Sequence, residues 1–117
     1  MGVIMFEITS LTKHPNQLHT LILDDNETAT FRLFYCGRMS EWYYDLQYKD
    51  LTINGRKVVL TPNSLRQFRN NIPFGIAFYA DSSVEPFEID AFSSGRVKMG
   101  ILSSDEVEEI EENIYND

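Results

Sequence analysis

The sequence has one cysteine, few basic residues and no long hydrophobic run. A single thiol, Cys36, cannot form an internal disulfide or a four-ligand zinc site, and this fits a reducing compartment. The first residues lack a basic region followed by an apolar stretch, so we expect no signal peptide. No window approaches the roughly 18 consecutive apolar residues of a membrane helix. We therefore expect no membrane association.

Positive charge is scarce and unevenly balanced. The chain has 18 acids against 10 bases, and residues 105–117 hold seven of the acids and no base. The rest of the chain has 11 acids and 10 bases, so its charge is near neutral. Recognition of nucleic acid requires a basic patch. The charge pattern therefore predicts no direct binding of nucleic acid.

Motifs that carry catalysis are also missing. The sequence has no G-x-S-x-G, P-loop, dinucleotide fingerprint or H-E-x-x-H motif. His14 and His19 are five residues apart, a spacing that matches no helical metal pair. Asp45 has no second titratable group in a recognisable motif, so we interpret it as structural, bonded to a turn backbone or to a base such as Arg38. We predict no enzyme, no metal and no cofactor.

What the sequence does have is alternation of apolar and polar residues with period two, which is typical of β-strands. Residues 17–23 and 27–36 are predicted to form a hairpin, and Asn54-Gly55 a tight turn between two further strands. Residues 62–70 are the only internal helical candidate, and 87–92 are predicted as a short edge strand or extended segment. The other predicted strands are 3–9, 41–48, 51–53, 57–60, 74–80 and 96–102. The pattern predicts an all-β domain, a small antiparallel β-sandwich or a barrel.

The stretch EWYYDLQYKD, residues 41–50, concentrates aromatic residues on one strand. Such a platform is suited to stacking on sugars or bases, so a small β-sandwich binding module for a carbohydrate or protein ligand, with carbohydrate recognised through Trp42 and Tyr43, is one hypothesis. The alternative is that this strand is central in the core, because large aromatics dominate core burial. The pattern favours a core that comprises Phe31, Leu33, Trp42, Tyr44, Leu46, Phe74, Ile76 and Phe78.

The period changes near the C-terminus. Ser103 precedes Glu106 by three residues, which is the spacing of a capping box. An apolar stripe of Val107, Ile110 and Ile114 follows at helical spacing. We therefore divide the chain into a β domain, 1–103, and an acidic helix or tail, 104–117. The stripe packs either on the β domain or on a partner, and we predict that it binds a partner.

Four segments, taken in order, are similar to a known family: FRLFYCGRMSEWYYDLQ, LTINGRKVVLTPNSL, PFGIAFY and RVKMGIL. The chain resembles, over residues 3–102, the small baseplate plug proteins of contractile-tailed bacteriophages, the group typified by a cyanophage baseplate plug. The positions that match the family pattern are Arg38, Trp42, Asp45, Leu46, Gly55, Leu65 and Gly75. Cys36 stands where a polar turn residue is expected, and the acidic tail is longer than the family core needs.

The resemblance implies a non-enzymatic virion structural protein. Such a protein is a plug or hub component that occludes or adapts the central channel of the baseplate. Its implied partners are other baseplate, hub or spike proteins, and it forms a homo-oligomer if the assembly symmetry demands one. The implied location is the tail baseplate of a phage or prophage, reached from the host cytoplasm during assembly.

Overall fold

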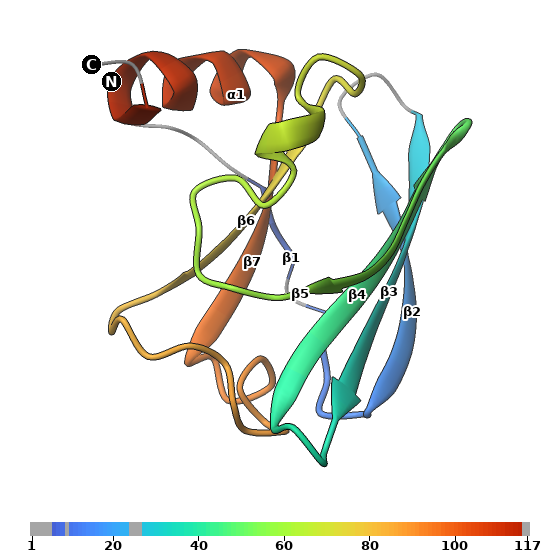
Figure 1. The fold of residues 1–117 in the computed structure, drawn as a ribbon, viewed down its shortest axis with the longest axis vertical. Coiled ribbons are helices and arrows are strands. Elements are labelled where there is room, and N and C mark those ends of the chain that lie inside the picture. The colour runs from blue at the N-terminus through green and yellow to red at the C-terminus, as the bar shows by residue number, and fades with distance from the viewer. Residues whose placement is uncertain (1–5, 9, 24–26, 116–117) are drawn as a thin grey trace.

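The computed structural model describes residues 6–8, 10–23 and 27–115. Figure 1 shows two β-sheets with a helix across one end of the molecule. The strands are β1 (Phe6–Ile8), β2 (Asn16–Ile22), β3 (Thr28–Cys36), β4 (Glu41–Tyr48), β5 (Leu51–Lys57), β6 (Gly75–Ala80) and β7 (Val97–Leu102). The helical segments are the 3₁₀ turn η1 (Arg66–Phe68), the helix α1 (Ser104–Ile110) and its continuation η2 (Glu111–Tyr115). No helix in these ranges is both long and apolar enough to cross a bilayer.

The two sheets are antiparallel throughout. One has the order β2-β3-β4-β5 and the other the order β1-β7-β6. They face each other as a sandwich (Figure 1), and the described strands do not close into a barrel. This confirms the predicted all-β class and selects the sandwich. The predicted hairpin of 17–23 against 27–36 is also confirmed, with His19 opposite Phe31, whereas residues 24–26 lie outside the described part of the chain.

The core lies between the sheets and follows the period of the strands. In β4, every second side chain is buried, beginning with Trp42, while Asp45 between them is only partly covered. Burial of apolar surface stabilises folding by about 25 cal/mol per Å², so these large side chains dominate the core. The structure buries all the side chains expected there: Phe31, Leu33, Trp42, Tyr44, Leu46, Phe74, Ile76 and Phe78.

The prediction of a hairpin turn at Asn54-Gly55 is wrong. Residues 51–57 form one strand, β5, and the turn between β4 and β5 is Lys49-Asp50 instead. The pairing skips at Asp45, which faces both Asn54 and Gly55, and this mismatch is a β-bulge. Gly55 has φ +64°, so the positive φ that the Asn-Gly pair suggested is present, but it serves the bulge.

The segment after β5 crosses from one sheet to the other. The Val58 N–H donates to the Trp42 carbonyl in the first sheet, and Thr61 forms an isolated bridge with Phe78 in the second. The helix predicted over 62–70 is reduced to the single turn η1. Leu65 precedes this turn and is fully buried, so the turn serves to insert one apolar side chain between the sheets.

Residues 88–92 form a bend and turns, so the short edge strand or extended segment predicted for 87–92 is wrong. Ala91 and Phe92 are both buried, although successive side chains in a strand point to opposite faces. The predicted capping box is confirmed: Ser103 Oγ accepts from the Glu106 N–H, and Glu106 Oε1 accepts from the Ser103 N–H at 2.8 Å.

Helix α1 packs on the three-stranded sheet. Val107 and Ile110 are buried with Ala77 of β6 and Leu102 of β7. The stripe is therefore covered by the chain itself in this structure, at least for its first two members. The side chain of the third, Ile114, lies outside the described part.

Candidate interaction site

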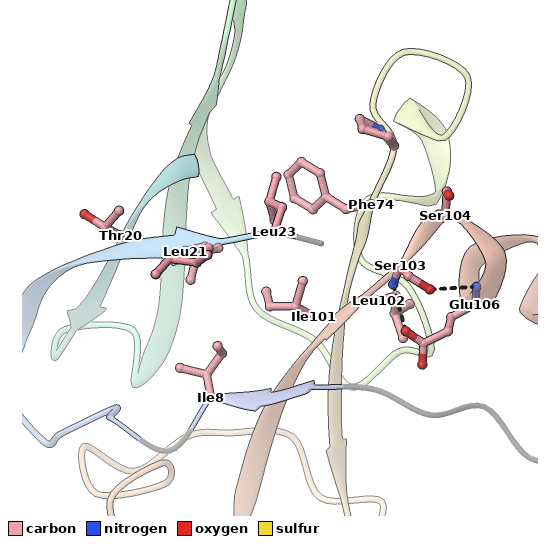
Figure 2. A pocket seen from close by; sticks show the side chains of 12 residues that line it. Ile8, Thr20, Leu21, Leu23, Phe74, Ile101, Leu102, Ser103, Ser104 and Glu106 are labelled. Atoms are coloured by element: carbon pink, nitrogen blue, oxygen red, sulfur yellow. Dashed lines mark hydrogen bonds between the residues drawn. The ribbon is translucent and has the colours of Figure 1, made fainter. Parts of the chain in front are cut away.

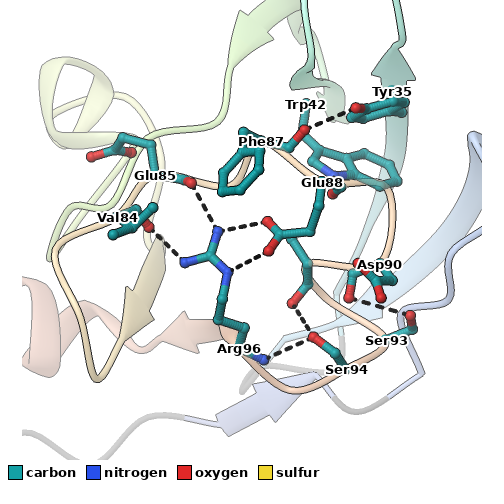
Figure 3. Close-up of polar contacts among 11 residues, drawn as sticks. Tyr35, Trp42, Val84, Glu85, Phe87, Glu88, Asp90, Ser93, Ser94 and Arg96 are labelled. Atoms are coloured by element: carbon teal, nitrogen blue, oxygen red, sulfur yellow. Dashed lines mark hydrogen bonds and ion pairs between the residues drawn. The ribbon is translucent and has the colours of Figure 1, made fainter.

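The segment between β6 and β7 has no regular secondary structure, yet its backbone is fixed by side chains from elsewhere. We call residues 84–96 the braced loop (Figure 3). Its centre is Arg96, whose guanidinium donates at 2.7 Å to each carboxylate oxygen of Glu88. The same group donates at 2.8 Å to the carbonyls of Val84 and Glu85. One side chain thus holds three positions of the loop through four donated hydrogen bonds, one more than the three N–H groups of a lysine supply.

The pair of Arg96 and Glu88 is electrostatically favourable. The hydrogen bonds from Arg96 hold the pKa of the Glu88 carboxyl below its ordinary value, although partial burial works against them. The same bonds raise the pKa of Arg96. Both side chains remain about one quarter exposed. The pair is therefore charged at neutral pH and anchors the loop.

The four-stranded sheet supplies further donors. The Tyr35 hydroxyl donates to the Phe87 carbonyl at 2.8 Å, and Trp42 Nε1 donates to the Glu88 carbonyl at 2.9 Å. The Leu60 N–H donates to the Glu85 carboxylate at 2.7 Å. Trp42 also meets the ring of Phe92 edge-on, with centroids 5.4 Å apart. The loop is thus tied to the core through the only tryptophan of the chain.

The same loop presents apolar side chains to solvent. Val84, Phe87 and Ile89 are all exposed, Phe87 by 55%. The Arg96 guanidinium lies 5.6 Å from the centroid of the Phe87 ring, a cation–π distance. The β3–β4 turn, which contains the exposed Met39, lies at this end of the sandwich too (Figure 1). A fixed loop with protruding apolar groups is suited to protein contact.

A second feature, which is concave, is a cleft of about 490 Å³ between β2 and β7. Figure 2 shows Leu23, Phe74 and Ile101 directed into the space between these strands. The cleft is lined by Ile8, Thr20, Leu21, Ile22, Leu23, Pro73, Phe74, Ile101, Leu102, Ser103, Ser104 and Glu106. Glu106 is the only titratable side chain among these, and its Oε1 is engaged in the capping box. The lining offers apolar contact and no acid–base pair.

Two residues of the family pattern meet at the bulge. Asp45 Oδ1 accepts a hydrogen bond from the Gly55 N–H at 2.7 Å. The bulge leaves this N–H without a ladder partner, and the carboxylate supplies one. The bond is to backbone, as one of the two predicted alternatives had it, but this backbone belongs to a bulge in β5 and not to a turn. Arg38, the other partner considered, is exposed in the β3–β4 turn.

Gly75, another residue of the pattern, makes room for a buried amide. A Cβ at this position would lie 2.6 Å from Asn63 Oδ1. That oxygen accepts from the Leu65 and Ile76 N–H groups at 3.0 and 3.2 Å. These two hydrogen bonds therefore fasten the start of β6 to the turn that carries Leu65.

The structure separates the two residues proposed for a sugar platform. Trp42 is 0% exposed, and Tyr43 points to the outer face of the sheet, where its ring stacks on Phe34 with centroids 5.9 Å apart. Adjacent residues of a strand face opposite sides, so the pair cannot form one surface. Among the described residues, no group of three or more potential ligands gathers as a metal site.

Sequence reasoning missed the braced loop. The signal was present as apolar residues alternating with acids over 84–90, followed by a lone arginine at 96. This alternation imitates a strand. Only the tertiary structure shows that Arg96 folds back onto the loop.

Comparison with known protein families identifies a match over most of the chain. Residues 5–104 match the model of the family described as cyanophage baseplate Pam3 plug gp18. No curated protein matches the chain. The match extends from the first described strand to the start of helix α1, so it spans both sheets and the braced loop. The chain belongs to the cyanophage baseplate plug family.

Proposed function

We propose that the protein is a non-enzymatic plug or hub component of a phage baseplate that occludes or adapts the central channel through protein–protein contacts. The family match over residues 5–104 carries this proposal. The hydrogen bond from the Gly55 N–H to Asp45 also supports it, because it gives this carboxylate a structural role. Its partners would be neighbouring baseplate, hub or spike proteins at the tail tip.

We also propose that residues 1–103 and 104–117 act as one body in the assembly. Contacts of Val107 and Ile110 with Ala77 and Leu102 support this. Ion pairs of Glu111 with Arg66 and Arg69, at 2.7 and 3.3 Å, add a second tie. A partner that bound Val107 and Ile110 would have to lift the helix off its sheet. The number of copies would follow the symmetry of the hub.

The test is a comparison of baseplates from a phage with and without the gene, imaged by electron cryo-microscopy. We expect axial density in the hub to disappear on deletion and to return on complementation. Occlusion further predicts that particles lacking the protein lose their genome before contact with a host. Axial density that is unchanged by deletion would contradict the proposal.

A further inference from the structure

The braced loop exposes several apolar side chains close together on one short segment. Single exposed hydrophobic residues are normal on protein surfaces. Here three of them, Val84, Phe87 and Ile89, lie within six residues, and two of the three border the Arg96 guanidinium. Pro86, Ala91 and Phe92 in the same loop are buried, so the loop separates an inner from an outer set of apolar side chains.

The backbone beneath these side chains is already ordered. The carbonyls of Val84, Glu85, Phe87 and Glu88 all accept hydrogen bonds from side chains of Arg96, Tyr35 or Trp42. Binding therefore does not require the loop to be ordered first, and this lowers the entropic cost of association.

The charge around the loop limits what it can bind. Residues 81–96 contain four acids and one base. Glu88 is paired with Arg96, and Glu85 accepts from the Leu60 N–H, while Asp81 and Asp90 are exposed. A second copy that docked through the same loop would place these exposed acids against each other, and an anionic lipid surface would repel them as well.

We propose that Phe87, flanked by Val84 and Ile89, inserts into an apolar socket on another baseplate protein, and that lysine or arginine side chains edge this socket. Central aromatic anchors within a polar rim are the usual source of binding energy in such interfaces. The exposed Asp81 and Asp90 would face the basic edge. This inference rests on the proposed function, because it takes the partner to be a baseplate subunit.

The experiment complements a gene-deleted phage with variants and measures the amount of protein in purified baseplates by quantitative mass spectrometry. Phe87→Ser is expected to reduce incorporation by about tenfold or more, since it removes the anchor. The matched control is Leu18→Ser, at a somewhat more exposed apolar position on the outer face of β2, which should incorporate like the parent. Asp90→Lys should also reduce incorporation, because it places a cation opposite the basic edge.

The outcomes separate this inference from the proposed function. A parent protein that is absent from baseplates overturns both. If Phe87→Ser incorporates at the same level as the parent, only the proposed apolar socket is wrong. Incorporation of Asp90→Lys at the parental level overturns the basic edge, and a parental dimer that Phe87→Ser dissociates assigns the loop to self-association instead. If Phe87→Ser melts well below the parent, Val84→Ser takes its place, with the same criteria.

Discussion

At the scale of single residues, two glycines of the family pattern are needed for different reasons. Gly55 has φ +64°, a backbone region that other residues enter at a cost, but its surroundings are open. Gly75 has no such φ, and the Asn63 amide occupies the space where a Cβ would lie. One position is fixed by backbone conformation and the other by packing.

We therefore predict different costs for three alanine substitutions. Gly55→Ala should destabilise the fold by about 1–2 kcal/mol through backbone strain. Gly75→Ala should cost about 1–3 kcal/mol or more, because it displaces the oxygen that binds the Leu65 and Ile76 N–H groups. The control is Gly37→Ala, whose Cβ would meet Tyr35 at an ordinary 3.8 Å.

Urea unfolding measures these differences. A Gly75→Ala protein as stable as Gly37→Ala would show that Asn63 moves freely, and the locking role of this amide would be wrong.

A second prediction at this scale concerns pH. The pKa of Glu88 is lowered in the folded state, chiefly by its hydrogen bonds from Arg96. Its contribution to stability is therefore complete above the ordinary glutamate pKa of about 4.3 and is lost as the pH falls through the lower, folded value. The difference in unfolding free energy between the parent and Glu88→Gln should shrink in that acidic range.

Chemical denaturation at a series of pH values tests this, with Glu109→Gln as a control at a partly exposed acid of helix α1. A difference between parent and Glu88→Gln that stays constant down to strongly acidic pH would mean that the ion pair does not stabilise the folded protein.

At the scale of elements, most strands could be predicted from the alternation of apolar and polar residues, because successive side chains of a strand point to opposite faces and only one face is buried. The predictions were wrong where one local sequence pattern is compatible with two structures. Gly55 in the pair Asn54-Gly55 has a positive φ, which suits either a tight turn or a bulge. Because β4 pairs with β5 on both sides of this point, the structure forms a bulge. Residues 87–92 alternate like a strand, but the Tyr35 hydroxyl and Trp42 Nε1 bind the Phe87 and Glu88 carbonyls that a ladder would use. Neither long-range partner is visible in a local pattern.

The C-terminal helix gives the prediction at this scale. A short helix is marginal in water by itself, so α1 depends on the burial of Val107 and Ile110. Removing residues 105–117 exposes Leu102 and Ala77, and we expect a large fall in melting temperature. An unchanged melt with failed baseplate assembly would instead favour a helix whose main contacts are with a partner.

At the scale of the whole molecule, the two features outside the sheets lie at opposite ends. Helix α1 and its ion pairs through Glu111 cover one end, and the braced loop forms the other (Figure 1). The sandwich between them is a rigid spacer with its own core. An assembly can therefore hold the protein at both ends at once, and each end can be altered separately.

This separation predicts additive energetics. Arg96→Gln loosens the braced loop and Glu111→Gln loosens the helix, and no contact joins the two sites in the described structure. Their effects on unfolding free energy should add to within about 0.5 kcal/mol in the double variant, as is usual for distant sites. Arg96→Gln with Glu88→Gln is the contrasting cycle: the partners touch at 2.7 Å, so the second substitution should cost less than it does alone. A coupling between the two ends as large as that of the contacting pair would show that the sandwich transmits strain, and the protein would then link its two contacts in the baseplate mechanically.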